Sequence, residues 1–289
     1  MSIDLHIHSK ASDGKLDVRE IIMEAKKRRI SFIAITDHDN ISCQIEAITE
    51  AKKTAINYIT GVELNITLTN PKYKEGKPFA LDLLGYQFNP DNEALKNKLA
   101  LLAKYREKRV AKIIEKVNLE LKKQGIPEFS DKDLQNIKKT VEGSLGRPHI
   151  ADYMVKKGIV TSRHEAFDKY LVECDVPKYP LNLKEASKLI REAGGKLVLA
   201  HPNDPNGTSL YPLTSNLIEQ TEIIKETILT YIDGIECWHT IHNASTEKHY
   251  VAFAKENGLI MTGGSDCHQK PVIMGTIDVP HWVALQFRD

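Results

Sequence analysis

Hydrophobic and polar positions alternate along this chain in two patterns. Short apolar runs typical of strands occupy residues 3–8, 31–36, 58–63 and 79–86, and later 196–200, 234–237 and 259–262. Between them, segments such as residues 17–29 and 41–55 repeat apolar residues every three or four positions, as amphipathic helices do. This strand–helix alternation predicts an α/β fold built on a parallel sheet, either open or closed into a barrel.

The alternation stops in the middle of the chain. Residues 94–124 follow one long helical pattern, and residues 131–139, 148–157, 162–170 and 183–193 predict shorter helices. We therefore expect a helical insertion carried on an α/β scaffold. Positions 96–123 of the long helix hold ten Lys or Arg and three Asp or Glu. This positive charge belongs either to a solvated helix face or to a cap that attracts an anionic substrate.

The composition is that of an ordinary folded protein. The 289 residues include 40 Lys or Arg and 39 Asp or Glu, a formal charge of +1, and 41% are hydrophobic. These values exclude disordered, collagen-like and coiled-coil chains, and they give no general reason to expect nucleic-acid or membrane binding. We expect no signal sequence and no membrane span. The four cysteines lie far apart, so we expect reduced thiols in a cytoplasmic protein.

Candidate chemistry gathers where the predicted strands end or helices begin. Acidic residues and histidines stand at seven such places: His6 and His8 with Asp13, Asp37-His38-Asp39, Glu63, Asp82, His149, His201, and Asp266 with His268. In parallel α/β folds, ligands and catalytic groups gather at the carboxyl ends of strands. His6 and His8 are two positions apart on a strand, so both rings point to one side and can share an ion. Asp39 is most simply a loop or helix-capping residue.

The side-chain types narrow the chemistry further. Six of the eleven histidines fall in this set. Imidazole binds zinc, iron and manganese, and carboxylates can bridge two cations. The sequence has no cluster of thiolates for a structural zinc site. A mixed set of histidines and carboxylates with open positions is typical of hydrolytic metal sites, and no convincing nucleophile or phosphate-cradling motif competes with it.

The order of these residues resembles a known family. The chain contains, in sequence, the segments DLHIHSKASDG, AITDHDN, GVELN, GRPHIA, LAHP, GIECWHTIHN and GGSDCHQ, which run from residue 4 to residue 269. Together they resemble the polymerase and histidinol phosphatase (PHP) superfamily of metal-dependent phosphoesterases. The resemblance covers nearly the whole chain.

The resemblance implies a distorted (β/α)7 TIM-like barrel with a helical insertion subdomain. Residues 1–90 and 190–289 would form the barrel with the metal site, and residues 91–189 would form the insertion as a cap. The end of the barrel at which the strands have their carboxyl ends would hold two or three divalent ions (Mn, Fe or Zn). Glu63 would bridge two ions, and Glu63, His201 and Asp266 would be catalytic. The implied metal ligands are His6, His8, Asp13, His38, Glu63, His149, His201, Asp266 and His268.

Two residues beside the implied ligands, Asp37 and Asp82, also have an implied role in the metal site. Asp37 would support His38 and fix the orientation of its ring. Relatives usually carry a histidine before the strand that ends in LLGY, and this chain has Asp82 there. A carboxylate in place of an imidazole would change the charge and the metal preference of the site. Asp82 is therefore either a further metal ligand or a residue that has left the cluster.

The insertion favours one branch of the superfamily. That branch resembles nucleoside 3′,5′-bisphosphate phosphatases and 5′-to-3′ exonucleases that act on short RNA. The resemblance implies that Arg147, Lys178 and His242 bind the phosphorylated substrate. A guanidinium group can donate two parallel hydrogen bonds to a phosphate. The implied reaction is hydrolysis of phosphate esters on nucleotides or 5′-phosphorylated short oligonucleotides by a metal-activated hydroxide.

Other functions stay open at this point. A cyclic phosphodiesterase or a histidinol-phosphatase-like enzyme would share the family motifs. An amidohydrolase shares the barrel and the His-x-His pair, but it usually needs a carboxylated lysine where Glu63 stands here. A non-catalytic metal-binding regulator would not need so complete a ligand set. We expect a phosphorylated small molecule or short oligonucleotide as the partner, with no membrane and no stable duplex nucleic acid.

Overall fold

Two β-sheets form the centre of the fold in the computed structural model, which describes residues 2–141 and 143–288. The first sheet has three parallel strands in the order β1-β2-β3, at Ser2–Asp4, Ile30–Ile33 and Asn57–Tyr58. The second has five strands in the order β4 to β8, at Gly61–Leu68, Phe79–Tyr86, Lys196–Leu199, Gly234–His239 and Ile260–Gly264. Isolated bridges from Ile7 to Cys267 and from His38 to Glu63 link the two sheets.

The direction of one strand departs from the expected barrel. β6, β7 and β8 are parallel, but β5 is antiparallel to both β4 and β6. A hairpin joins β4 directly to β5, whereas a parallel pair needs a crossover connection of about a dozen residues or more. The expected α/β fold with parallel strands is confirmed, but strand pairing does not confirm a (β/α)7 barrel.

Longer helices flank the sheets: α1 Val18–Lys27, α2 Gln44–Thr54, α7 Leu183–Glu192, α8 Leu217–Thr227 and α9 Ala244–Glu256. α1 shows how local sequence fixes them. Asp17 and Glu20 form a capping box at its start, and Val18, Ile21 and Ala25 bury its apolar face, as the spacing predicts. Short 3-10 turns lie at Lys74–Gly76, Leu229–Tyr231 and His281–Phe287. Within the described residues, no helix has the length and apolar content needed to cross a membrane.

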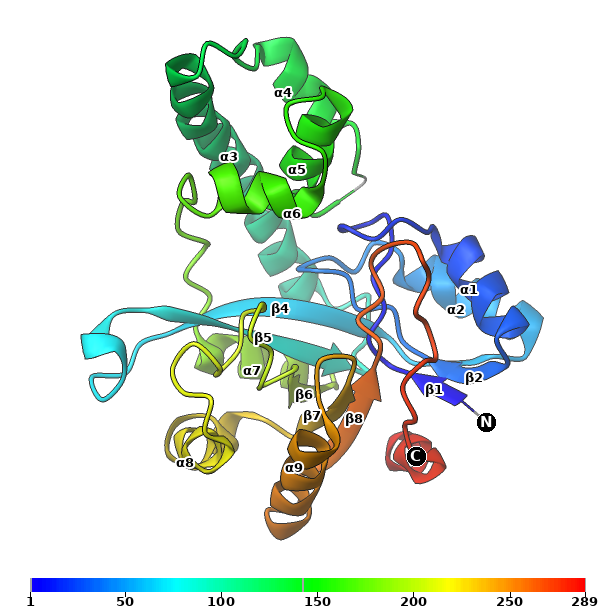
Figure 1. The fold of residues 1–289 in the computed structure, drawn as a ribbon. Helices are drawn as coiled ribbons and strands as arrows, with labels where there is room; N and C mark the ends of the chain where they lie inside the picture. Colours follow the sequence, from blue (N-terminus) through cyan, green and yellow to red (C-terminus); the bar gives the residue numbers. More distant parts are fainter. Residues whose placement is uncertain (1, 142, 289) are drawn as a thin grey trace.

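The remaining helices stand at one end of the sheets (Figure 1). They are α3 Glu93–Lys123, α4 Asp131–Lys138, α5 Arg147–Lys156 and α6 Arg163–Ala166, followed by a π-helical turn, η2, at Phe167–Leu171. We call them the cap helices. α3 joins two hydrophobic cores: Leu95 and Leu102 pack with the strands, whereas Val110 and Val117 pack in a second core with α5 and η2.

α7 lies within the sequence range expected for the insertion but packs with the sheets. Its buried residues Leu183, Ala186 and Ile190 belong to the same hydrophobic core as the strands. A division at residue 189 would therefore cut through this helix. The second core, by contrast, draws its buried residues from positions 110–174.

Candidate metal centre

Segments that follow the strands bring histidines and carboxylates together. His6 and His8 follow β1, while Asp266 and His268 follow β8. The backbone N–H of Asp266 donates to the carbonyl of His6 at 2.8 Å, so these segments run side by side. Parallel strand ends that meet in this way are where the sequence pattern expects a site. Three further members come from the loop after β2, from β4 and from the loop after β6: His38, Glu63 and His201.

The carboxylate of Glu63 lies at the centre of the cluster and is 1% exposed. Its Oε1 atom lies 3.1 Å from Nε2 of His201 and 3.6 Å from Nε2 of His6. Its Oε2 atom lies 2.9 Å from Nδ1 of His38 and 3.2 Å from Nε2 of His8. One carboxylate thus faces four imidazoles, an arrangement that suits a bridge between two cations.

The donor atoms fit divalent cations. Among the described residues, four overlapping groups have ligand atoms within 4.8 Å of one another: His6, His8 and Asp266; His6, Glu63 and His201; His8, Asp13, His38 and His268; and His6, Glu236 and His239. Nε2 of His6, Nε2 of His8 and Oδ1 of Asp13 are buried without a hydrogen-bond partner. A buried polar atom without a partner is costly. Unpaired nitrogen and oxygen atoms that converge in this way are satisfied by a metal ion.

Proton affinities in the cluster follow from the same proximity. Burial raises the pKa of Glu63, but the charges of His38 and His6 outweigh burial and hold this pKa well below its ordinary value. Burial lowers the pKa of His201, while the hydrogen bond and charge of Glu63 raise it to about 10. Protons and cations therefore compete for the same atoms, so that metal binding releases protons.

Glu236, in β7, lies behind the cluster. Its Oε1 atom accepts a hydrogen bond from Nδ1 of His6 at 3.1 Å, and its Oε2 atom accepts one from the backbone N–H of His201 at 2.8 Å. When the ring gives up one proton to bind a cation, this hydrogen bond keeps the other proton on Nδ1, so the lone pair is on Nε2, the nitrogen that faces Glu63. Sequence reasoning did not include Glu236 in the site. The available signal was an acidic residue inside the apolar run 234–237.

Asp37 has a different role from the expected one. Its carboxylate accepts hydrogen bonds from the backbone N–H of Ser9 at 2.8 Å and from the hydroxyls of Ser9 and Ser12 at 2.6 Å each. These bonds hold the loop that carries Asp13. The expectation that Asp37 orients the ring of His38 is wrong, because the loop after β1 and the thiol of Cys43 supply the donors that occupy the carboxylate.

Two expected ligands lie outside the four groups. Asp82 pairs with Asn65 across β4 and β5 and accepts a hydrogen bond from its Nδ2 atom at 2.5 Å. His149 uses both ring nitrogens: Nδ1 accepts from the backbone N–H of Gly146 at 3.1 Å, so Nε2 donates to the carbonyl of Ser12 at 2.8 Å. Both residues line the adjoining cavity. In this arrangement neither adds an atom to the ligand groups.

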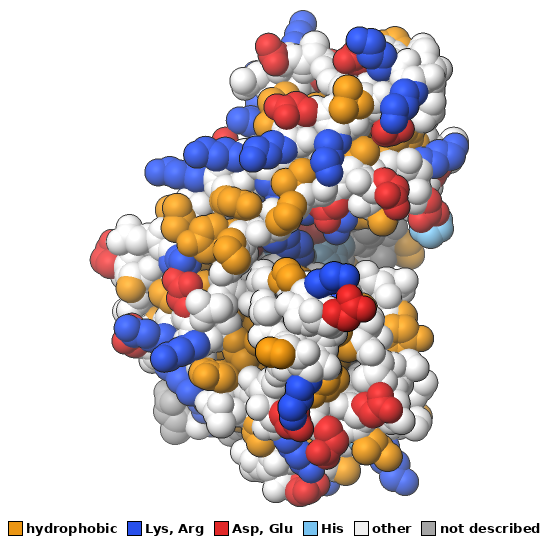
Figure 2. Space-filling model, turned by 90° about the vertical axis from the view of Figure 1, so that its left-hand side faces the viewer, with side chains coloured by type: hydrophobic (Ala, Val, Ile, Leu, Met, Phe, Trp, Pro, Cys, Tyr) orange, Lys and Arg blue, Asp and Glu red, His pale blue; other side chains and the backbone are white. Residues whose placement is uncertain are grey.

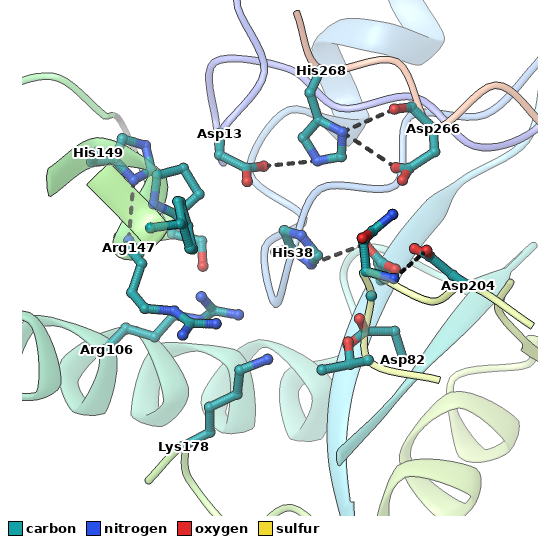
Figure 3. A pocket seen from close by; sticks show the side chains of 18 of the residues that line it. Asp13, His38, Asp82, Arg106, Arg147, His149, Lys178, Asp204, Asp266 and His268 are labelled. Atoms are coloured by element: carbon teal, nitrogen blue, oxygen red, sulfur yellow. Dashed lines mark hydrogen bonds and ion pairs between the residues drawn. The ribbon is translucent and has the colours of Figure 1, made fainter. Parts of the chain in front are cut away.

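A cavity of about 380 Å³ adjoins the cluster (Figure 3). Asp13, His38, Asp266 and His268 border it on one side, and the labelled basic side chains reach into it from another side. Four cations line this cavity: Arg106, Arg109, Arg147 and Lys178. Metal-ligating groups and cations that face one space suit a phosphate group, whose oxygens need several charged donors.

The four cations differ in how their charge is balanced. Arg109 and Arg147 both form ion pairs with Asp175. Lys178 has no carboxylate within ion-pair distance in residues 2–141 and 143–288. Burial lowers the pKa of Lys178 and the nearby guanidinium groups lower it further, while the charge of Asp82 opposes them. Lys178 is therefore the cavity cation whose charge is least compensated.

Arg106 links α3 to the loop after β2. Its Nε and Nη2 atoms both donate to Oδ2 of Asp39, at 2.8 and 2.6 Å. Asp39 is thus more than a loop or capping residue: it joins the His38 loop to the cap helices. Sequence reasoning did not separate Arg106 and Arg109 from the exposed cations of this helix, because the sequence does not reveal which side of α3 faces the cavity.

His242 lies outside the cavity lining, contrary to expectation. Its Nδ1 atom donates to the carbonyl of Cys237 at 2.9 Å, and burial lowers its pKa to about 4. The ring of His239 is 5.6 Å away, centroid to centroid, and Nε2 of His239 lies 3.7 Å from Oδ2 of Asp266. The turn after β7 folds back on the strand, so His239 lies at the cluster and His242 lies behind it.

Comparisons with known proteins agree with this geometry. The family model of the PHP domain matches residues 4–175. A 5′-3′ exoribonuclease from Haemophilus influenzae is 29% identical over 272 residues, which cover 92% of this chain and 89% of the relative. A 3′,5′-nucleoside bisphosphate phosphatase from Chromobacterium violaceum is 28% identical over 271 residues, which cover 92% of this chain and 87% of the relative.

A solved structure of a similar protein has the same overall fold. A Bifidobacterium adolescentis protein assigned as a metal-dependent phosphoesterase superposes with a TM-score of 0.80 at 26% identity, covering 98% of this chain and 94% of that chain. The family match covers more than half of the chain, and the His–carboxylate cluster lies where the family motifs converge. The chain therefore belongs to the PHP-domain family and is a metal-dependent hydrolase of phosphate esters.

Proposed function

We propose that this protein removes phosphate from nucleotides of the 3′,5′-bisphosphate type or from 5′-phosphorylated short oligonucleotides. The observation that carries the proposal is the shared cavity, which the His–carboxylate cluster and four cationic side chains both line. A phosphate ester needs cationic donors around the oxygens that metal ions leave free. The exoribonuclease and the bisphosphate phosphatase among the relatives support a nucleotide substrate.

We propose that two or three divalent ions of Mn, Fe or Zn bind the cluster, since imidazoles and carboxylates accept each of these metals. When bound, such ions polarise the phosphate and activate the attacking water. We leave Asp82 and His149 out of the proposed ligand set, because neither has an atom in the four ligand groups. The proposed ligands are His6, His8, Asp13, His38, Glu63, His201, Asp266 and His268.

The protein's own groups would do the rest. Glu63, His201 and Asp266 would hold the ions against the reacting phosphate, and Glu63 would offset the mutual repulsion of two cations. Arg147 and Lys178 would donate to the phosphate oxygens and neutralise their charge. Each such charge-assisted hydrogen bond contributes about 1.5–3 kcal/mol. The cap helices would close the cavity on the side away from the cluster.

A substrate panel with metal-loaded protein tests this proposal. Turnover of adenosine 3′,5′-bisphosphate or of a 5′-phosphorylated RNA oligomer would support it, with His8→Ala as a control that should lose both metal and turnover. Elemental analysis of anaerobically purified protein gives the metal content. Turnover confined to a cyclic diester, histidinol phosphate or a dihydropyrimidine-type amide would overturn the proposal in favour of the corresponding alternative. Full metal content without turnover would favour a regulator.

A further inference from the structure

Four lysines form a ridge along α3: Lys104, Lys108, Lys112 and Lys116. Residues four apart follow one ridge of a helix, with about 6 Å of axial rise between neighbours. All four side chains are exposed. Figure 2 shows Lys and Arg side chains in a row across the upper, helical part of one face of the molecule. We call these four residues the lysine ridge.

The charge of the lysine ridge is not compensated by ion pairs. On several other helices, a lysine pairs with a carboxylate three or four residues away, as in Lys27–Glu24, Lys53–Glu50 and Lys169–Glu165. No ridge lysine has a carboxylate within ion-pair distance in the part of the chain that the structure describes. Two glutamates of the same helix are already engaged, Glu107 with Lys138 and Glu120 with Lys123. Lys116 donates a hydrogen bond to the backbone carbonyl of Asp175 at 2.8 Å, but a carbonyl does not neutralise its charge. The ridge therefore offers positive charge without a paired carboxylate to a ligand.

A small recess of about 20 Å³ lies beside the cavity and shares part of its lining. Its walls include Tyr105 and Tyr179, whose rings lie 5.5 Å apart in an edge-to-face arrangement. Lys108 and Lys112 are three and seven positions beyond Tyr105, which puts them on successive turns of the same side of the helix. Three cations line both the cavity and the recess: Arg106, Arg109 and Lys178. Positive charge thus continues from the cavity, past two tyrosines, to the lysine ridge.

From this arrangement we infer that α3 binds a single-stranded oligonucleotide whose 5′-phosphorylated end occupies the cavity. The phosphates beyond the first nucleotide lie against the lysine ridge, and a base stacks at Tyr105 or Tyr179. Cationic grooves with aromatic stacking surfaces are typical of single-strand binding, whereas a duplex keeps its bases stacked inside. A mononucleotide is confined to the cavity and gains nothing from the ridge. This inference rests on the proposed function and narrows its substrate class to oligonucleotides.

The test compares two triple variants that remove the same charge. K108A/K112A/K116A removes most of the ridge, whereas the control K26A/K52A/K248A removes exposed lysines from α1, α2 and α9. With metal-loaded protein, the ridge variant is expected to lower kcat/KM for a 5′-phosphorylated RNA octamer about tenfold, the effect of three exposed charge contacts. Its kcat/KM for adenosine 3′,5′-bisphosphate should stay unchanged. The control variant should change neither value, and melting curves check that both variants fold.

Binding without turnover gives a second readout. Fluorescence anisotropy of chelator-treated protein with the octamer should show weaker binding only for the ridge variant. The slope of log affinity against log salt should become less steep by about 2 for three lost contacts to a single strand. Unchanged octamer binding, equal losses on both substrates, or equally tight binding of a duplex octamer would overturn the inference. If the unmodified enzyme hydrolyses neither substrate, the proposed function fails, while anisotropy still decides whether the ridge binds RNA.

Discussion

Glu236 accepts a hydrogen bond from Nδ1 of His6 at 3.1 Å, and both side chains are fully buried. Burial raises the pKa of Glu236, but the charge of His6 holds it below its ordinary value, so the carboxylate stays ionised. The other carboxylate oxygen holds the backbone N–H of His201. One side chain on β7 thus fixes two proposed ligands that come from different strands.

Replacing Glu236 with glutamine should weaken metal binding while the fold persists. The amide of glutamine presents an N–H group to one of two existing donors, so only one of the two hydrogen bonds can survive. Loss of such a partner of a ligand typically costs about 10- to 100-fold in metal affinity. Competition with a chelating dye measures this change, and Glu247→Gln on α9 serves as the control. Equal affinities in both variants would mean that Glu236 has no orienting role.

Glu63→Gln and Asp39→Asn should affect different properties: the first metal binding and activity, the second the stability of the fold. Glu63 faces four imidazoles, so its neutral variant should lose metal and nearly all activity. Asp39 instead pairs with Arg106, and loss of that charge-assisted contact should lower the free energy of unfolding by about 1.5–3 kcal/mol. Metal content should stay close to normal in Asp39→Asn. Elemental analysis and denaturant titration separate the two effects, and metal loss in Asp39→Asn would contradict this assignment.

Sequence reasoning predicted most residues of the candidate metal centre because its signals are local. His6 and His8 share one strand face, and Glu63, His201 and Asp266 each stand in or just after an apolar run, so strand ends alone bring them together. The antiparallel direction of β5 was missed, because β4 extends to Leu68 and turns directly into a hairpin. The strand predicted from the sequence ended at residue 63, which allowed a crossover connection to the next strand. In the structure, β4 and β5 are instead joined as a hairpin.

Contacts between distant segments could not be predicted in this way. Glu236 reaches His6 because β8 pairs with β7 and is also hydrogen-bonded to the segment after β1, an arrangement that strand periodicity does not encode. The same holds for Arg106, whose partner Asp39 follows a different strand. For His242, the matching motif was present, but the turn after β7 places His239 at the cluster instead. Motifs thus identify candidate residues, whereas packing decides which of them reach the site.

Lys178→Ala should impair catalysis more than Arg147→Ala. Lys178 lines the cavity without an ion-pair partner among the described residues, whereas Arg147 shares Asp175 with Arg109. Loss of one charge-assisted phosphate contact corresponds to roughly 10- to 150-fold in kcat/KM, and Lys178→Ala should lie in the upper part of that range. Metal content should not change. Lys122→Ala, at the exposed end of α3, is the control and should have little effect.

The charge of Lys178 should make substrate binding sensitive to alkaline pH. Burial and the nearby guanidinium groups lower its pKa, and Asp82 opposes them only in part. Only the protonated ammonium attracts a phosphate, so raising the pH through this lowered pKa removes the attraction. KM for adenosine 3′,5′-bisphosphate should then rise at pH values where an ordinary lysine is still charged. Lys178→Arg keeps its charge throughout, because a guanidinium stays protonated, and its KM should remain flat over the same interval. A parallel rise of KM in both proteins would assign the titration to another group.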